Sequence, residues 1–153
     1  MKIFNKRNIN IGICVFFLAF FGYSQEIEKS IFITGNTWST GNTEVLSQIT
    51  KDAESASNAM LLVLGNSTHN EDFRDALDQQ LKLISGFKKE AYFLPGNHEW
   101  SKNGYKGVQA IEKYIQKNSK AKFYPDGGEP IKKHNLSENV VLITLDSQWF
   151  LEN

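Results

Sequence analysis

The sequence predicts an α/β fold, because short apolar runs alternate along it with longer stretches whose apolar residues recur every three or four positions. The short runs are typical of strands, and the longer spacing is typical of amphipathic helices. The chain has 153 residues, of which 41% are hydrophobic. That length suits one hydrophobic core rather than two, so we expect a single domain.

The first 24 residues differ in composition from the rest. Lys2, Lys6 and Arg7 precede an almost uninterrupted apolar run over residues 9–21, and small residues follow it up to Ser24. This order is typical of a signal peptide, so we expect an exported protein that is periplasmic, outer-membrane associated or secreted. An uncleaved anchor is the alternative, although a bilayer span needs about 20 apolar residues.

The first elements of the expected domain are a strand, a helix and a second strand. Residues 30–34 form an apolar run that ends at Gly35-Asn36 and predict a strand. Residues 42–57 predict a helix from the spacing of Val45, Leu46, Ile49 and Ala53. Residues 60–64 predict the second strand, which ends at Gly65-Asn66.

The following segments continue this alternation. Residues 72–84 predict an amphipathic helix that Gly86 closes, because Phe73, Leu77, Leu81 and Ile84 recur at intervals of three and four. Residues 91–94 predict the third strand. Residues 107–118 predict the third helix, with Val108, Ile111, Tyr114 and Ile115 on one face.

The last third of the chain is expected to add strands. Residues 140–145 form an apolar run that stops at Asp146 and predict a buried strand. Phe123 and residues 131–136 indicate further short strands. Four strands thus end in polar turns, and such turns meet at one edge of an open α/β sheet, where these folds place their chemistry.

Charge and cysteine content exclude some partners. The 17 acidic and 17 basic residues balance, so we expect no nucleic-acid partner, and membrane contact only through the signal segment if it stays uncleaved. The single cysteine, Cys14, lies inside the apolar run of that segment. The exported chain therefore has no disulfide, and core packing or a bound metal has to stabilise it.

The clearest local motif is the turn after the third predicted strand, where Pro95-Gly96 is followed by Asn97, His98 and Glu99. The Asn97 oxygen suits a divalent metal ion, and His98 suits contact with a phosphate oxygen or a leaving group. The alternative is a polar turn that carries a surface histidine.

The segment 96–99 resembles the Gly-Asn-His-Asp/Glu box of the calcineurin-like metallophosphoesterase superfamily. The runs that end at Asn36, Asn66 and Asp146, and the Gln148-Trp149 pair, follow that family's order, and most resemble a bacterial exported branch. The resemblance implies a metallophosphoesterase-type αββα sandwich and metal-dependent hydrolysis of phosphate esters. It implies His98 as the catalytic group, and Asn97, Asn66 and Asn36 at metal-ligand positions.

The metal motifs depart from the family. Its first two turns normally carry aspartate, and the second aspartate bridges two metal ions, but this chain has Asn36 and Asn66. A carboxylate offers two oxygens and a negative charge that reduces the repulsion between two cations, whereas an amide does neither well. We therefore expect impaired catalysis. If the chain is active, we expect divalent Mn, Fe or Zn as its cofactors, and the alternative is a chain without a cofactor.

The family's remaining histidine ligands, which include a Gly-His-x-His turn, lie beyond the strand that ends here at Asp146. Residues 25–153 therefore resemble a partial domain, the N-terminal strand and helix layer, without the second layer. Among the other histidines, His69 is a candidate substitute ligand, with solvation as the alternative, and His134 is interpreted as surface charge.

Three further residues have structural alternatives. Asp146 is expected either to hydrogen-bond the backbone of the metal-site loops or to end a strand. Trp38 stands where many family members have a histidine ligand. Both Trp38 and Trp100 are expected to pack under the loops, and contact of one of them with a ligand is the alternative.

Three functional hypotheses follow. The first is a phosphoesterase with one metal ion or unusual ligands, acting on a phosphate ester. The second is a catalytically inactive pseudoenzyme that serves as a binding or scaffold module. The third is a truncated product without stable structure. The missing carboxylates and histidines favour loss of catalysis over its retention.

Overall fold

The computed structural model describes residues 26–69, 72–101 and 103–152. The predicted signal peptide over residues 1–24 lies outside this range. The elements are, in chain order, β1 (Ser30–Gly35), α2 (Thr40–Ser55), β2 (Ala59–Leu64), α3 (Arg74–Ile84), β3 (Glu90–Phe93), α4 (Asn97–Ser101), α5 (Tyr105–Asn118), β4 (Lys122–Phe123), β5 (Ile131–Asn135), β6 (Val141–Leu145) and α6 (Trp149–Glu152).

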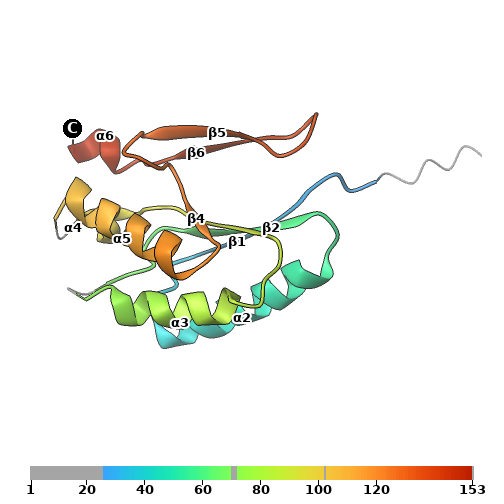
Figure 1. Ribbon diagram of the computed structural model, residues 1–153, viewed down its shortest axis with the longest axis horizontal. Helices are drawn as coiled ribbons and strands as arrows, with labels where there is room; N and C mark the ends of the chain where they lie inside the picture. The colour runs from blue at the N-terminus through green and yellow to red at the C-terminus, as the bar shows by residue number, and fades with distance from the viewer. Residues whose placement is uncertain (1–25, 70–71, 102, 153) are drawn as a thin grey trace, which may run out of the picture.

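The central sheet is parallel, with its strands in the order β1-β2-β3-β4. Each strand therefore pairs with the next one along the chain, and right-handed crossovers in a constant direction place all connecting helices on one face. Figure 1 shows α2 and α3 on one side of this sheet, and the antiparallel hairpin of β5 and β6 on the other. The predicted α/β class is confirmed.

Strand β2 is buried on both sides, and its alternate residues serve two clusters. Leu61 and Val63 join the larger cluster with Leu77, Phe93 and the other side chains from α2, α3 and α5. Met60 and Leu62 point to the opposite face and join Tyr92, with hairpin residues packed against them. The apolar run of β2 is continuous because both faces of this strand are covered.

The expected elements all form, with shifted ends. Helices α2 and α5 each begin two residues earlier than expected, α3 begins two residues later, and the box expected as a turn is the short helix α4. Residues 140–145 were expected to form a buried strand, and this is wrong in part. Ile143 in β6 is 64% exposed, because the hairpin has only two strands and the main sheet covers one face of it.

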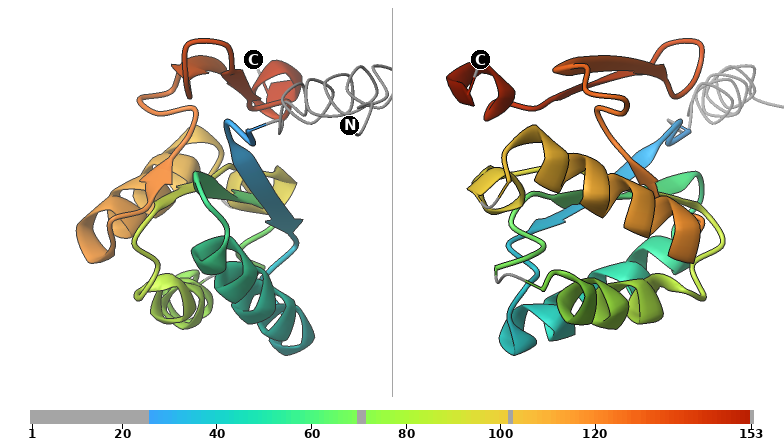
Figure 2. Two further views of the ribbon diagram at one scale, coloured as in Figure 1. Left: turned by 90° about the vertical axis from the view of Figure 1, so that its right-hand side faces the viewer. Right: turned by 60° about the vertical axis from the view of Figure 1, so that its left-hand side comes forward.

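The hairpin also corrects the expectation that a second layer is missing. Strands β5 and β6 lie over the face of the main sheet that the helices leave open, and Figure 2 shows this arrangement from two further directions. Leu142 and Leu136 contact the cluster on that face. The described residues thus form a layer of helices, a parallel sheet and a two-stranded second sheet.

No helix in the described ranges is both long enough and apolar enough to cross a membrane.

Candidate functional site at the carboxyl edge of the parallel sheet

The turns that follow β1, β2 and β3 lie against one another. Asn36 and Asn66 both have positive φ angles, 55° and 62°, which asparagine adopts more readily than most residues. The backbone N–H of Asn36 donates to the carbonyl of Gly65 at 3.1 Å, which ties the first turn to the second. The parallel sheet thus brings together the predicted ligand positions 36, 66 and 97 along one edge. We call the turns at these three positions the rim.

Two glycines allow the second and third turns to approach. A Cβ atom on Gly65 would lie 2.3 Å from the Cα atom of Gly96, and a Cβ atom on Gly96 would lie 2.8 Å from the backbone nitrogen of Asn66. Neither position can hold a side chain unless the backbone moves. The glycine of the box is therefore required by packing between two turns.

The buried side chain of Glu99 connects the second and third turns through hydrogen bonds. Its side chain is 2% exposed, and Oε1 accepts hydrogen bonds from the backbone N–H groups of Ser67 and Thr68 and from the Thr68 hydroxyl. Oε2 accepts from the N–H groups of Asn66 and Gly96 at 2.9 and 2.7 Å. Hydrogen bonds to a carboxylate are stronger than those between neutral groups, so Glu99 holds the second and third turns together.

The predicted metal ligands face protein donors. The side-chain oxygen of Asn36 accepts the Trp38 indole N–H at 2.7 Å, and that of Asn66 accepts the backbone N–H of His98 at 3.3 Å. Asn97 is exposed at the start of α4. Within the described ranges, no group of three or more His, Cys, Asp or Glu side chains is arranged to hold a metal ion.

His98, the predicted catalytic group, contacts the second turn. Its Nδ1 lies 3.1 Å from the carbonyl oxygen of Thr68 and 3.3 Å from Nδ1 of His69. A carbonyl only accepts, so the contact with Thr68 is a hydrogen bond in the tautomer that carries the proton on Nδ1 of His98.

His69, the candidate substitute ligand, is held by stacking. Its ring lies 4.2 Å from that of Trp38 with an interplanar angle of 19°. Trp38 was expected to pack under the loops, but it is 37% exposed and lies over His69. The structure therefore brings His69 to His98, and it uses the tryptophan of the first turn to do so.

A buried polar network beneath the rim was not predicted from the sequence. The Thr37 hydroxyl donates to Oε1 of Gln80 at 2.6 Å, and Nε2 of Gln80 donates to the Ser67 carbonyl at 2.7 Å. Gln80 is fully buried although it is polar. Its position among Leu77, Leu81 and Ile84 on the buried face of α3 is the sequence signal that identifies it.

Asp146 links the end of β6 to the box. Its Oδ2 accepts the indole N–H of Trp100 in α4 at 2.9 Å, and its Oδ1 accepts the backbone N–H groups of Gln148 and Trp149. Burial raises the pKa of this carboxyl above its ordinary value, although the three hydrogen bonds act in the opposite direction. The residue thus reaches the box through a tryptophan side chain.

The interpretation of His134 as surface charge is wrong. Its ring lies 4.1 Å from that of Tyr124, and its Nε2 is buried, with no hydrogen-bond partner among the described residues. Burial, and then the charge of Lys132, hold the pKa of His134 below its ordinary value. The residue belongs to the interface between the two sheets and lies away from the rim turns.

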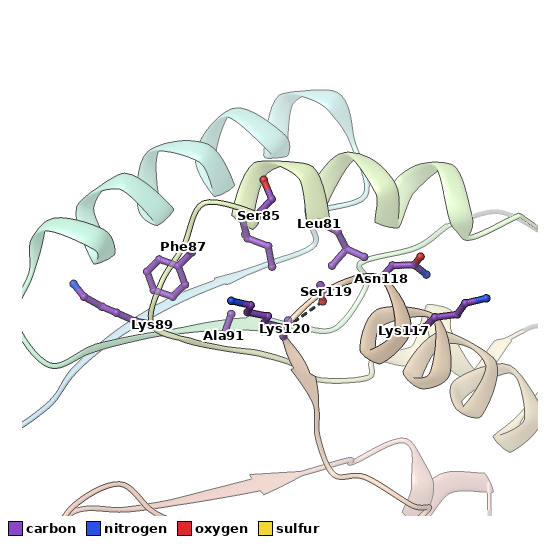
Figure 3. Close-up of a pocket in the computed structure, with 11 residues that line it drawn as sticks. Leu81, Ser85, Phe87, Lys89, Ala91, Lys117, Asn118, Ser119 and Lys120 are labelled. Atoms are coloured by element: carbon purple, nitrogen blue, oxygen red, sulfur yellow. Dashed lines mark hydrogen bonds between the residues drawn. The ribbon is translucent and has the colours of Figure 1, made fainter.

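Two cavities differ in their position relative to the rim and in the residues that line them. One of about 370 Å³ lies between α3 and α5 at the amino-terminal ends of β3 and β4, and Figure 3 shows Lys89 and Lys117 at its margin extending apart from each other. The Lys89 amine donates to carbonyls at the end of α2. The other, of about 230 Å³, borders the rim and is lined by His98, Thr68, Arg74, Lys106 and neighbouring residues.

Charged side chains and an imidazole line the rim cavity. Arg74, Lys106 and His98 lie at its border, but Arg74 pairs with Asp72 at 3.4 Å and the Glu99 carboxylate also lines the cavity. The predicted site residues and this cavity lie at the same edge of the sheet. No family model, curated protein or solved structure matches the chain.

Proposed function

We propose that this chain is exported and that its described residues form a metallophosphoesterase-type arrangement of turns, which recognises a phosphate ester at the rim and hydrolyses it poorly. The supporting observation is the meeting of the turns at Asn36, Asn66 and Asn97-His98 beside a cavity that Arg74 and Lys106 border. The family resemblance supplies the substrate class. His98 would contact a phosphate oxygen, and Arg74 and Lys106 would attract its charge.

The residues at the ligand positions do not fit the paired cations of that family. Asn36 and Asn66 are neutral, and their side-chain oxygens already accept protein N–H groups. A divalent ion would have to displace the Trp38 indole and the His98 backbone N–H without gaining the attraction of a carboxylate. The neutral amides of Asn36 and Asn66 therefore impair turnover.

A second candidate is a binding or scaffold module with no catalytic activity. The same two hydrogen bonds favour it, because they engage the side-chain oxygens of Asn36 and Asn66 with protein donors. The buried Glu99 carboxylate braces the second and third turns from within the protein. Under this candidate, ligands bind at the rim and His98 has no chemical role.

The test restores the missing charges. We expect the native chain to bind Mn²⁺ weakly and to cleave p-nitrophenyl phosphate slowly. The double variant Asn36→Asp, Asn66→Asp should bind Mn²⁺ at least about tenfold more tightly, because each carboxylate contributes more than about 1 kcal/mol at short range in a partly desolvated site. Asn58→Asp is the matched control, since Asn58 also has a positive φ, 48°, but lies at the opposite edge of the sheet.

The outcomes separate the candidates. Rapid cleavage by the native chain that His98→Ala abolishes would show that hydrolysis is not impaired. Slow cleavage with the same dependence on His98 supports the impaired phosphoesterase. No cleavage in any variant, together with binding of inorganic phosphate that Arg74→Ala weakens, favours the binding module. Absence of phosphate binding and of any Mn²⁺ response in the double variant would exclude the phosphoesterase proposal.

A further inference from the structure

The pair of imidazoles at the rim lies outside the ligand set that the family resemblance assigns, and it offers a different coordination chemistry. The Nδ1 atoms of His69 and His98 are 3.3 Å apart. Zinc binds histidine nitrogen at about 2.0–2.1 Å, so two nitrogens at a tetrahedral angle lie about 3.3–3.4 Å apart. We propose that His69 and His98 together bind one Zn²⁺ or Cu²⁺ ion through their Nδ1 atoms.

A third donor lies at a similar distance. The Thr68 carbonyl oxygen is 3.1 Å from Nδ1 of His98, close to the edge length of the same tetrahedron. When Nδ1 of His98 is protonated, this carbonyl accepts its proton. Binding requires that proton to move to Nε2, which keeps the imidazole neutral, and the freed lone pair then faces the same region as the carbonyl.

Both rings are positioned in advance by contacts behind them. His69 stacks on Trp38, whose indole N–H is fixed by the side-chain oxygen of Asn36. His98 lies in the short helix α4, where its backbone N–H is held by Asn66 and the adjacent Glu99 is anchored in the rim. Such supporting contacts orient histidine ligands and typically change metal affinity by about 10–100-fold.

The chemistry of this pair distinguishes it from the oxygen ligands of the proposed function. Imidazole nitrogen suits Zn²⁺ and Cu²⁺, whereas carbonyl and carboxylate oxygens suit Mn²⁺ and Mg²⁺. The inference therefore goes beyond the proposed phosphoesterase and does not need it. A chain that fails every Mn²⁺ test at the three asparagines would still bind Zn²⁺ at the two histidines.

The experiment is calorimetric titration of the full chain with Cu²⁺, Zn²⁺, Mn²⁺ and Mg²⁺. We expect one Zn²⁺ or Cu²⁺ per chain, with Cu²⁺ bound more tightly than Zn²⁺ and Mn²⁺ bound far more weakly. His69→Ala and His98→Ala should each weaken Zn²⁺ binding by more than about tenfold, and Trp38→Ala should weaken it by about tenfold through loss of orientation.

His134→Ala is the matched control, because His134 is the third histidine of the chain and lies at the interface between the sheets. It should bind Zn²⁺ as the native chain does. His69 is exposed and His98 is half-buried, so both variants should fold, which circular dichroism checks. Unchanged Zn²⁺ affinity in either variant of the pair, or no Zn²⁺ and Cu²⁺ binding by the folded native chain, would overturn the proposal.

Discussion

The turns after β1 and β2 have the same Gly-Asn sequence and the same backbone conformation, but different tertiary surroundings. Gly35 and Asn36 are exposed, and the Asn36 side-chain oxygen bonds a donor two residues away. Gly65 packs against Gly96, and the Asn66 side-chain oxygen bonds a donor 32 residues away. The Asn36 side chain therefore lies at the periphery of the rim, whereas the Asn66 side chain is a structural part of it.

The largest expected difference between the two turns is the loss of stability in Gly65→Ala compared with that in Gly35→Ala. A Cβ atom at position 65 would lie 2.3 to 2.7 Å from backbone atoms of the third turn, which cannot yield as a side chain can. We expect a loss of about 3 kcal/mol or more in the free energy of unfolding. At position 35 the nearest atom is 3.3 Å away, and the loss should stay below about 1 kcal/mol. Urea unfolding of both variants measures the difference, and equal losses would contradict it.

Glu99→Gln tests whether the carboxylate holds the second turn. The amide would retain one acceptor oxygen, but it would also point an NH₂ group at backbone N–H donors. We expect a loss of about 2–3 kcal/mol, as for other buried hydrogen bonds to charged groups. Thermal unfolding measures it, and hydrogen exchange should locate faster opening at residues 66–68. An unchanged exchange rate there would show that Glu99 does not hold the turn.

Comparing the stability of Asn66→Asp with that of Asn36→Asp tests how each turn tolerates a negative charge. The backbone N–H of residue 66 already donates to Glu99, so a carboxylate at 66 places two negative charges in one partly buried site. We expect a loss of about 1 kcal/mol in EDTA at position 66 and little change at the exposed position 36. Mn²⁺ should restore the stability of Asn66→Asp by binding the folded form. Equal melting temperatures for the two variants in EDTA would contradict the comparison.

Trp38→Phe alters the first turn only locally. The phenyl ring keeps a stacking surface for His69 but lacks the N–H group that Asn36 accepts. Because this bond is at the surface, the free energy of unfolding should fall by less than about 0.5 kcal/mol. A loss as large as that of Glu99→Gln would mean that the Asn36 side chain is a structural part of the rim after all.

The smallest expected effect is a pH dependence of the free energy of unfolding. It arises at His134 in the hairpin, so it should be the same for variants of either turn. The pKa of His134 is lowered in the folded chain, so the unfolded chain takes up the proton first as pH falls through its ordinary value near 6.5. The contribution of His134 is fully present above that pH and is lost on acidification. His134→Phe keeps an aromatic ring against Tyr124 and should flatten the stability profile between pH 7 and 5 without changing the order of the turn variants.

Some residues of the candidate site were predictable because their chemistry is visible in the chain. The box at residues 96–99 and the Gly-Asn turns were identified from short motifs at strand ends, and the parallel sheet brought them together. Gln80 and Trp38 were not identified as site residues. A buried glutamine on an apolar helix face and a tryptophan that stacks on a histidine acquire their roles from partners distant in sequence.

The sequence by itself determined the alternation of strands and helices and the placement of polar residues at strand ends, because these depend on local periodicity and on glycine and asparagine turns. Only the tertiary structure decided which atoms those residues meet. The contact of Gly65 with Gly96, the donors around Glu99 and the approach of His69 to His98 join segments about 30 residues apart. Such contacts depend on strand order and helix packing, which no local pattern in the chain encodes.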